Sequence, residues 1–393
     1  MDYQRILLIV IDSLGNGAVP DAGRYNSLGA DTLGHVGAHL RIRLQLPLFQ
    51  RLGLGALRSQ RPLLSVSILR TIGYYSNLRP VSCGVSNRES QWEMMGLPTL
   101  TEADIFPRGL PQMITERVKS LSLRSVIGNQ LMSTPQALIN YGELQSTTGD
   151  LLVYTTADST MWLAAHETTI EMAELRLVCQ RVRRLLDQSE LTINRVNGLL
   201  FTGEGPLTYY PCDYCSYEMM PASPTSLGKL VDRGLTVMTI GKTTNLFPDQ
   251  EISHGYPNQG DGKNIGQLLE TMSVDFSGVV VTDLNDLGRL AGHRRNPERF
   301  GQLLMQLDHQ LEEVVSNLQA SDLLLITGNH GNDPAYPGDA HTRELVPLFA
   351  YSPVMSARGQ LGPNLTLGDI GATILETFGL SPLAGHSFLN QLK

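Results

Sequence analysis

The stretch SDLLLITGNHGNDPAYPGDAHTRE, residues 321–344, opens with an apolar run at 323–326 that ends in a threonine and a glycine. This pattern predicts a buried strand that runs out into a loop. The loop carries Asn329 and His330, and His341 follows further along. In open α/β sheets, ligand sites collect at the carboxyl ends of strands. The stretch therefore predicts a metal or phosphate site at a strand end, and a solvated polar loop is the alternative.

Length and composition limit the function classes. The 393 residues suit two or three domains, and 41% of them are hydrophobic, which allows a sizeable core without disulfides. The net charge is -8 and no basic patch is interleaved with aromatic residues, so nucleic-acid binding is not expected. The N-terminal run MDYQRILLIVIDSLG lacks signal-peptide features, and no apolar run reaches membrane-spanning length. We expect a cytoplasmic protein without membrane contact, and the sequence does not identify a protein partner.

The four cysteines are Cys83, Cys179, Cys212 and Cys215, and the last two form a single CDYC motif. This spacing leaves a redox pair or half of a zinc site open as functional interpretations. The flanking residues are typical of a loop and no second pair follows, so a structural interpretation is simpler. The small number of cysteines fits a reducing compartment.

The N-terminal third predicts part of an α/β core. Residues 5–11 are continuously apolar, as expected for a central parallel strand, and end at Asp12. Residues 46–57 predict a helix that ends at glycines, and 64–75 predict one or two strands. Residues 82–91 predict a loop, after which WEMMGL begins a helix. A loop that leads into a helix N-terminus is suited to binding an anion.

The pattern changes after residue 100. Helix-like and strand-like segments in 101–222, including a strand that ends at Asp158, predict an inserted α+β cap domain. From 223 to 393 the alternation of strands and helices returns. The predicted fold is therefore an α/β core (1–100 and 223–393) with a central, mostly parallel sheet flanked by helices, interrupted by the insert.

Polar residues follow four predicted strands that are far apart in sequence. Parallel topology brings such strand ends to one edge of the sheet, which favours a functional site over chance placement. The residues concerned are Asp12, the 82–91 loop, Asp283, Asp286, His293, Asn329, His330 and His341.

The chain resembles the phosphopentomutase family of the alkaline phosphatase superfamily. The resemblance runs nearly end to end and includes the inserted cap. It rests on the ordered motifs VIDSLGNGAVPDA, GADTLGHV, WEMMGL, TTADS, IGK, GHRR, HGNDP and HTRE. It implies an alkaline phosphatase-like core, two divalent ions (usually manganese), a phosphorylated threonine, and interconversion of ribose or deoxyribose 1-phosphate and 5-phosphate.

The resemblance assigns several roles residue by residue. Asp158 and Lys242 match positions of the sugar-phosphate site, although the arginine expected nearby is replaced around Cys212–Tyr214. The matching metal-ligand positions are Asp12, His293, His330 and His341.

Other positions depart from the family pattern. Two ligand aspartates fall on Asn329 and Gly288, and Asp286, two residues before Gly288, would be a ligand only if the backbone there is rebuilt. The nucleophilic threonine falls on Asn87 and the aspartate before it on Ser86, while Ser90-Gln91 replaces a glycine-histidine pair.

These departures weaken the implied metal centre. Two dications about 4 Å apart repel by roughly 16 kcal/mol at an effective dielectric constant near 20. Anionic ligands must offset this repulsion, and here two of three ligand aspartates are neutral residues. The remaining carboxylate and histidines predict at most a single ion, manganese or zinc.

Two interpretations of the activity follow. A carboxamide cannot accept a phosphoryl group, so Asn87 predicts a pseudoenzyme that has lost mutase chemistry and binds a pentose phosphate or related ligand, or a partner protein. In the alternative, Ser86 is the nucleophile of an active metal-dependent phosphopentomutase-type isomerase, an intramolecular phosphotransferase, with a rearranged site. A metal-dependent hydrolase that activates water is a third possibility.

Overall fold

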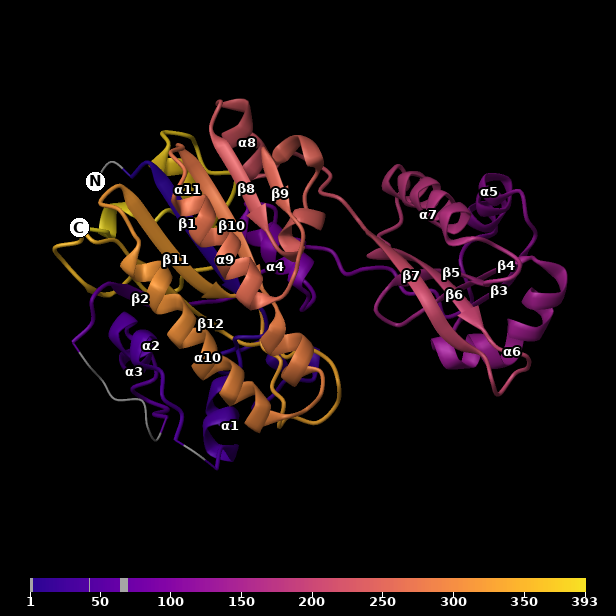
Figure 1. The fold of residues 1–393 in the computed structure, drawn as a ribbon, viewed down its shortest axis with the longest axis horizontal. Helices are drawn as coiled ribbons and strands as arrows, with labels where there is room; N and C mark the ends of the chain where they lie inside the picture. The colour runs from indigo at the N-terminus through magenta and orange to yellow at the C-terminus, as the bar shows by residue number, and fades with distance from the viewer. Residues whose placement is uncertain (1–2, 42, 64–69) are drawn as a thin grey trace. The chain divides into compact units, whose positions relative to one another are not determined.

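The computed structural model describes residues 3–41, 43–63 and 70–393. The chain forms two compact units. The core unit comprises 1–100 and 223–393, and the inserted unit comprises 101–222. Figure 1 shows the helices and strands of both units.

The core unit is built on an eight-stranded sheet in the order β13-β2-β12-β11-β1-β10-β8-β9. Strand β12 is antiparallel to both of its neighbours, and the other pairs are parallel. The strands are β1 (Arg5–Ile11), β2 (Tyr74–Leu78), β8 (Thr236–Ile240), β9 (His254–Tyr256), β10 (Gly278–Leu284), β11 (Asp322–Gly328), β12 (Val346–Tyr351) and β13 (Gly359–Gln360). This arrangement confirms the predicted α/β class with a central, mostly parallel sheet.

The three central strands of the sheet, β1, β10 and β11, end at the same level. Every residue of β1, β10 and β11 is buried, as their continuous apolar runs predict. The register pairs Ile11 with Leu284 on one side and with Gly328 on the other. Because all three strands are parallel, the residues that follow them emerge together at the same edge.

Helices cover both faces of this sheet. Helices α1, α2, α9 and α10 pack on one face and form a large apolar cluster with β1, β10 and β11. Helices α4, α8 and α11 contact one another on the opposite face (Figure 1). The helices are α1 (Thr32–His39), α2 (Pro47–Leu52), α3 (Leu54–Leu57), α4 (Asn87–Met94), α8 (Ser226–Asp232), α9 (Asp261–Met272), α10 (Pro297–Ser316) and α11 (Gly368–Thr377).

The inserted unit has its own five-stranded sheet in the order β3-β4-β5-β6-β7. Helices α5 and α7 pack on one face and α6 on the other, each with a separate apolar cluster. The elements are α5 (Gln112–Ser122), β3 (Val126–Leu131), α6 (Thr134–Thr148), β4 (Leu151–Thr155), β5 (Thr160–His166), α7 (Met172–Asp187), β6 (Arg195–Thr202) and β7 (Tyr210–Glu218).

The structure corrects some local predictions. The helix that was expected to begin at WEMMGL begins at Asn87, so Trp92 lies near its end and the 82–91 loop is shorter than predicted. The predicted helix at 46–57 is divided at Gly53, which adopts a positive φ of 117°. Part of the strand prediction for 64–75 lies outside the described residues, and β2 begins at Tyr74. No helix within the described ranges is long and apolar enough to cross a bilayer.

Candidate functional site

Three buried side chains meet where the central strands end. Asp12 follows β1, Asp283 is the penultimate residue of β10, and Asn329 follows β11. None of the three is more than 5% exposed. Asp283 was noted at a strand end but was not assigned a role from the sequence, because it lies inside an apolar strand run. The sheet therefore brings two carboxylates and one carboxamide to one edge.

The carboxamide of Asn329 is held in one orientation. Its Oδ1 accepts hydrogen bonds from the backbone N–H groups of Ser13 (3.0 Å) and His330 (2.7 Å). Its Nδ2 donates to Asp12 Oδ1 at 2.8 Å and to Asn87 Oδ1 at 2.9 Å. Because only the amide nitrogen carries hydrogens, an aspartate at 329 could not make the last two bonds.

Asn87 continues this network to the second carboxylate. It is the first residue of α4, and its Nδ2 donates to Asp283 Oδ2 at 2.9 Å. Gln91, one turn later, donates to both Asn87 Oδ1 (2.8 Å) and Asp283 Oδ2 (3.0 Å), and it accepts from Thr243 Oγ1 (2.7 Å). Amide donors thus link Asp12 to Asp283. Gln91 was noted in the sequence only as a substitution, although it is a central member of this network.

The two carboxylates differ in their electrostatics. Burial acts to raise the pKa of Asp12, but the charges of His330 and Lys242 outweigh it and lower that pKa. Burial and the neighbouring charge of Asp12 raise the pKa of Asp283 to about 7. Amide donors bond to both acids, and the raised pKa of Asp283 reduces the charge repulsion between them.

The three predicted ligand histidines lie together. The rings of His330 and His341 stack with centroids 3.9 Å apart, and His341 Nε2 lies 3.2 Å from His293 Nε2. His330 Nε2 is 3.3 Å from Asp12 Oδ1. Burial lowers the pKa of His330, and burial also lowers the pKa of His341 to about 3.

Gly288 and Asp286 do not supply the missing carboxylate. A Cβ on Gly288 would overlap the Asp12 carboxylate and lie 2.6 Å from Ser13 Oγ, so the side chains of Asp12 and Ser13 occupy the space where a side chain at 288 would begin. Asp286 pairs with Arg289 at 2.7 Å and accepts from the Asp261 N–H at 3.2 Å. The structure therefore does not bring Asp286 into the group around Asp12.

Ser86 is the N-cap of α4. Its Oγ accepts from the Glu89 N–H at 3.4 Å and donates to the Glu89 carboxylate. Glu89 also accepts from Arg88 Nη2 at 2.8 Å. These contacts are those of a helix N-cap, and they also place the Glu89 carboxylate beside the Ser86 hydroxyl.

The predicted sugar-phosphate residues belong to different units. Lys242 is exposed at the end of β8 in the core unit. Asp158 is exposed in the turn between β4 and β5 of the inserted unit, where it accepts from Thr156 Oγ1 (2.6 Å) and Thr160 Oγ1 (2.9 Å). Arg195 Nη2 lies 3.6 Å from its carboxylate.

The described residues do not fit a two-metal centre. Amide hydrogens of Asn329 face Asp12, and within the described ranges no group of three or more His, Cys, Asp or Glu side chains is arranged to hold a metal ion. Three buried polar atoms at the site lack hydrogen-bond partners, namely Ser13 Oγ, Asp283 Oδ1 and His330 Nε2. Of these three atoms only Asp283 Oδ1 belongs to a carboxyl group, so they add at most one negative ligand to Asp12.

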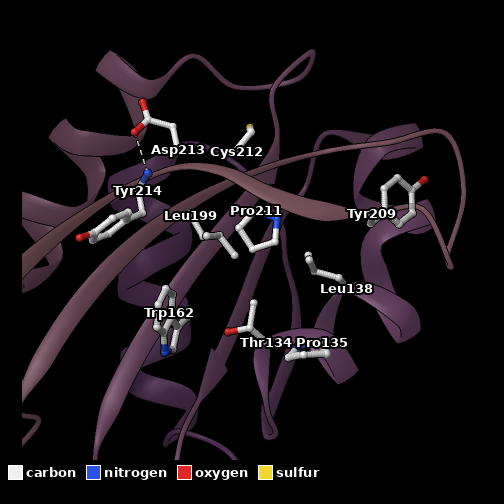
Figure 2. A pocket seen from close by; sticks show the side chains of 10 residues that line it. All are labelled: Thr134, Pro135, Leu138, Trp162, Leu199, Tyr209, Pro211, Cys212, Asp213 and Tyr214. Atoms are coloured by element: carbon white, nitrogen blue, oxygen red, sulfur yellow. Dashed lines mark hydrogen bonds between the residues drawn. The ribbon is translucent and has the colours of Figure 1, made fainter. Parts of the chain in front are cut away.

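A cavity of about 560 Å³ lies in the inserted unit, between α6 and the face of strands β5, β6 and β7. Trp162, Leu199 and Pro211 point into it (Figure 2). Its charged residue, Asp213, accepts from the Tyr214 N–H at 2.8 Å and points away from Trp162 (Figure 2). Phosphate groups require cationic or N–H donors, so this apolar cavity does not suit a sugar phosphate.

Comparison with known proteins places the chain in a family. A profile described as the Metalloenzyme superfamily matches residues 229–382. Phosphopentomutase from Limosilactobacillus reuteri (strain DSM 20016) is 38% identical over 395 residues, which cover 100% of this chain and 99% of the relative. Phosphopentomutase from Levilactobacillus brevis is 39% identical over 396 residues, which cover 100% of both. Among solved structures, a phosphoglycerate mutase from Leishmania mexicana has a TM-score of 0.48 at 11% identity and aligns over 96% of each chain.

The full-length identity to the two curated relatives confirms the family indicated by the motifs: the protein belongs to the phosphopentomutase family and has its alkaline phosphatase-like α/β fold.

Proposed function

We propose that this member of the phosphopentomutase family has lost the standard mutase chemistry and retains a site for a pentose phosphate or a related phosphorylated ligand. The observation that carries the proposal is the amide network between Asp12 and Asp283, in which Asn329 and Asn87 supply the hydrogens. Amide donors bond to one oxygen of each carboxylate, Asp12 Oδ1 and Asp283 Oδ2. We further propose a cytoplasmic setting, as for an enzyme family that acts on phosphorylated sugars.

The proposed loss of mutase chemistry also includes the covalent step, in which the family's nucleophile accepts the phosphoryl group. Asn87 occupies the nucleophile position, and its carboxamide both accepts and donates hydrogen bonds within the network. An amide has no lone pair of sufficient nucleophilicity to form a phosphoryl ester, so no phosphoenzyme can form at this residue. Binding can survive this loss, because Lys242 remains available as a cation for a phosphate group.

The metal content tests the first half of the proposal. We expect dialysis against excess manganese followed by buffer exchange to leave fewer than one tightly bound manganese ion per chain, because Asp12 and Asp283, whose pKa is raised to about 7, do not offset the charge of two dications. The same analysis for zinc should give at most one ion per chain. Elemental analysis by mass spectrometry measures both values, and two retained ions per chain would contradict the proposed loss of the two-metal centre.

Substrate turnover and binding test the second half. With manganese present, we expect no interconversion of ribose 1-phosphate and ribose 5-phosphate above the rate without protein. Calorimetric titration with ribose 5-phosphate should nevertheless detect binding. Lys242→Ala should weaken that binding about tenfold, since a charge-assisted contact to a phosphate contributes about 1.5 kcal/mol.

Lys263→Ala is the matched control, because Lys263 is also an exposed lysine of the core unit, on α9. Equal weakening by both substitutions would show non-specific charge attraction and not a site at Lys242. Turnover within a hundredfold of an active family member would overturn the pseudoenzyme assignment.

An active isomerase with Ser86 as the nucleophile is the second candidate. The contact between the Ser86 hydroxyl and the Glu89 carboxylate favours it, because a carboxylate can accept the proton as a hydroxyl attacks. If turnover is detected, Ser86→Ala should abolish it, whereas the cap function alone predicts only a loss of about 1 kcal/mol in stability.

A further inference from the structure

Two buried cysteines of the inserted unit meet between helix α7 and strand β7. Cys179 lies on α7 and is fully buried, and Cys215 lies on β7 with 8% of its surface exposed. Both belong to the apolar cluster between α7 and the sheet. All four cysteines of the chain are free thiols.

A glycine makes room for the two sulfur atoms. Gly198 of β6 is the cross-strand partner of Cys215. A Cβ built on Gly198 would lie 2.7 Å from Cys215 Sγ and 2.8 Å from Cys179 Sγ, so both sulfurs converge on the space that a side chain at 198 would fill. Both thiols therefore border the same side-chain-sized space beside Gly198.

The cysteine of the CDYC motif that precedes Cys215 is not its partner. Cys212 is exposed, its Sγ donates to Glu167 Oε2 at 3.7 Å, and a bulge separates it from the regular β6–β7 register. Tertiary structure therefore pairs Cys215 with Cys179, which lies on another element, instead of with its neighbour at the C-x-x-C spacing.

The two thiols are chemically unequal. The hydrogen bond from Cys179 is the main influence on Cys215 and lowers its pKa to about 7, against the opposing effect of burial. The same contact, together with burial, raises the pKa of Cys179. Cys215 is also the more exposed of the two, so it is the thiolate that a small oxidant reaches first.

We propose that Cys179 and Cys215 form a reversible intramolecular disulfide when the protein meets a peroxide. The Cys215 thiolate attacks one peroxide oxygen, so that an S–O bond forms, the O–O bond breaks, and an alcohol or water leaves. The Cys179 sulfur then attacks the Cys215 sulfenic acid, so that the S–S bond forms and water leaves with the Cys179 proton. Two thiols and one peroxide give one disulfide, one alcohol (or water) and one water.

The bond would join helix α7 to strand β7. Strand β7 is the edge of the inserted sheet and pairs only with β6. Its other face supplies Pro211 and Tyr214 to the apolar cavity (Figure 2), and its end leads into the return connection at 222–223. A covalent link to α7 would fix this edge strand and the cavity wall.

The experiment treats the full chain with a small excess of hydrogen peroxide and then blocks remaining thiols with iodoacetamide. We expect two of the four thiols to be lost, and a peptide joining Cys179 to Cys215 in a non-reducing digest. The melting temperature of the inserted unit, followed by Trp162 fluorescence in a Trp92→Phe background, should rise by roughly 10 °C and return after dithiothreitol.

Cys212→Ala is the matched control and should leave the linked peptide and the temperature shift unchanged. Cys215→Ala and Cys179→Ala should each abolish the linked peptide and the temperature shift. Because the digest is also made on the wild-type chain, poor folding of either variant does not decide the outcome. A bond between Cys212 and Cys215, a bond between chains, or oxidation to sulfonic acid without a link would overturn the proposal.

Discussion

Asn329→Asp should lower the free energy of unfolding by about 3–5 kcal/mol in the presence of a chelator. The substitution removes the two hydrogens that Nδ2 donates to Asp12 and Asn87, at 2.8 and 2.9 Å. It also places a second carboxylate against Asp12 in a site where Asn329 is fully buried. Because the resemblance to the family places a ligand aspartate at this position, the sign of this effect separates a site built around amides from one built around metals.

Urea unfolding measures the effect. The chain has two tryptophans, and Trp162→Phe leaves Trp92 to report on the core unit. Asn364→Asp, at an exposed asparagine, is the control for the added charge and should change stability by less than about 0.5 kcal/mol. An Asn329→Asp variant as stable as the parent in chelator would mean that the amide network is not what satisfies Asp12.

Glu344→Ala should lower the free energy of unfolding by a similar amount, about 3–5 kcal/mol. The carboxylate is fully buried and accepts from the Gly17 N–H (3.0 Å), from the Thr32 N–H (2.9 Å) and hydroxyl (2.6 Å), and from the Thr342 hydroxyl (2.6 Å). Truncation leaves two buried backbone N–H groups without an acceptor. Since these groups hold the loop after β1 beside the loop after β11, the site geometry should loosen with the fold.

Glu344→Gln has the same shape and keeps one carbonyl oxygen, so it should lose less than half as much stability as Glu344→Ala. Glu313→Ala, at an exposed position of α10, should change stability by less than about 0.5 kcal/mol. The same Trp92 signal follows unfolding. If the glutamine variant proves as unstable as the alanine variant, the negative charge and not the set of hydrogen bonds would be the essential feature.

The prediction from sequence was most successful where one local pattern determines one structure. Continuous apolar runs such as 5–11 and 323–326 became the fully buried strands β1 and β11. The strand-end principle placed Asp12, His330 and Asn329 together, as the structure shows. The start of α4 was predicted too late, because the polar sequence before Trp92 does not reveal that Ser86 caps a helix there.

Side-chain partners across the chain could not be predicted. Asn87 was identified from the sequence only as a lost nucleophile, whereas the structure makes it a link between Asn329 and Asp283. Asp286 was considered as a ligand, but Arg289 and the start of α9 engage it instead. The contacts of Asn87 join residues that are about two hundred positions apart, and local periodicity does not predict them.

The sequence by itself determined the family and the α/β class, because these depend on residue identity and on the order of motifs, and it predicted which ligand and nucleophile positions are replaced. Only the tertiary structure decided what the replacements do. It showed that amide hydrogens bridge Asp12 and Asp283 and that Cys215 meets Cys179 instead of Cys212. Hydrogen bonds and thiol contacts act over about 3–4 Å, and such proximity is set by the packing of strands and helices and not by spacing along the chain.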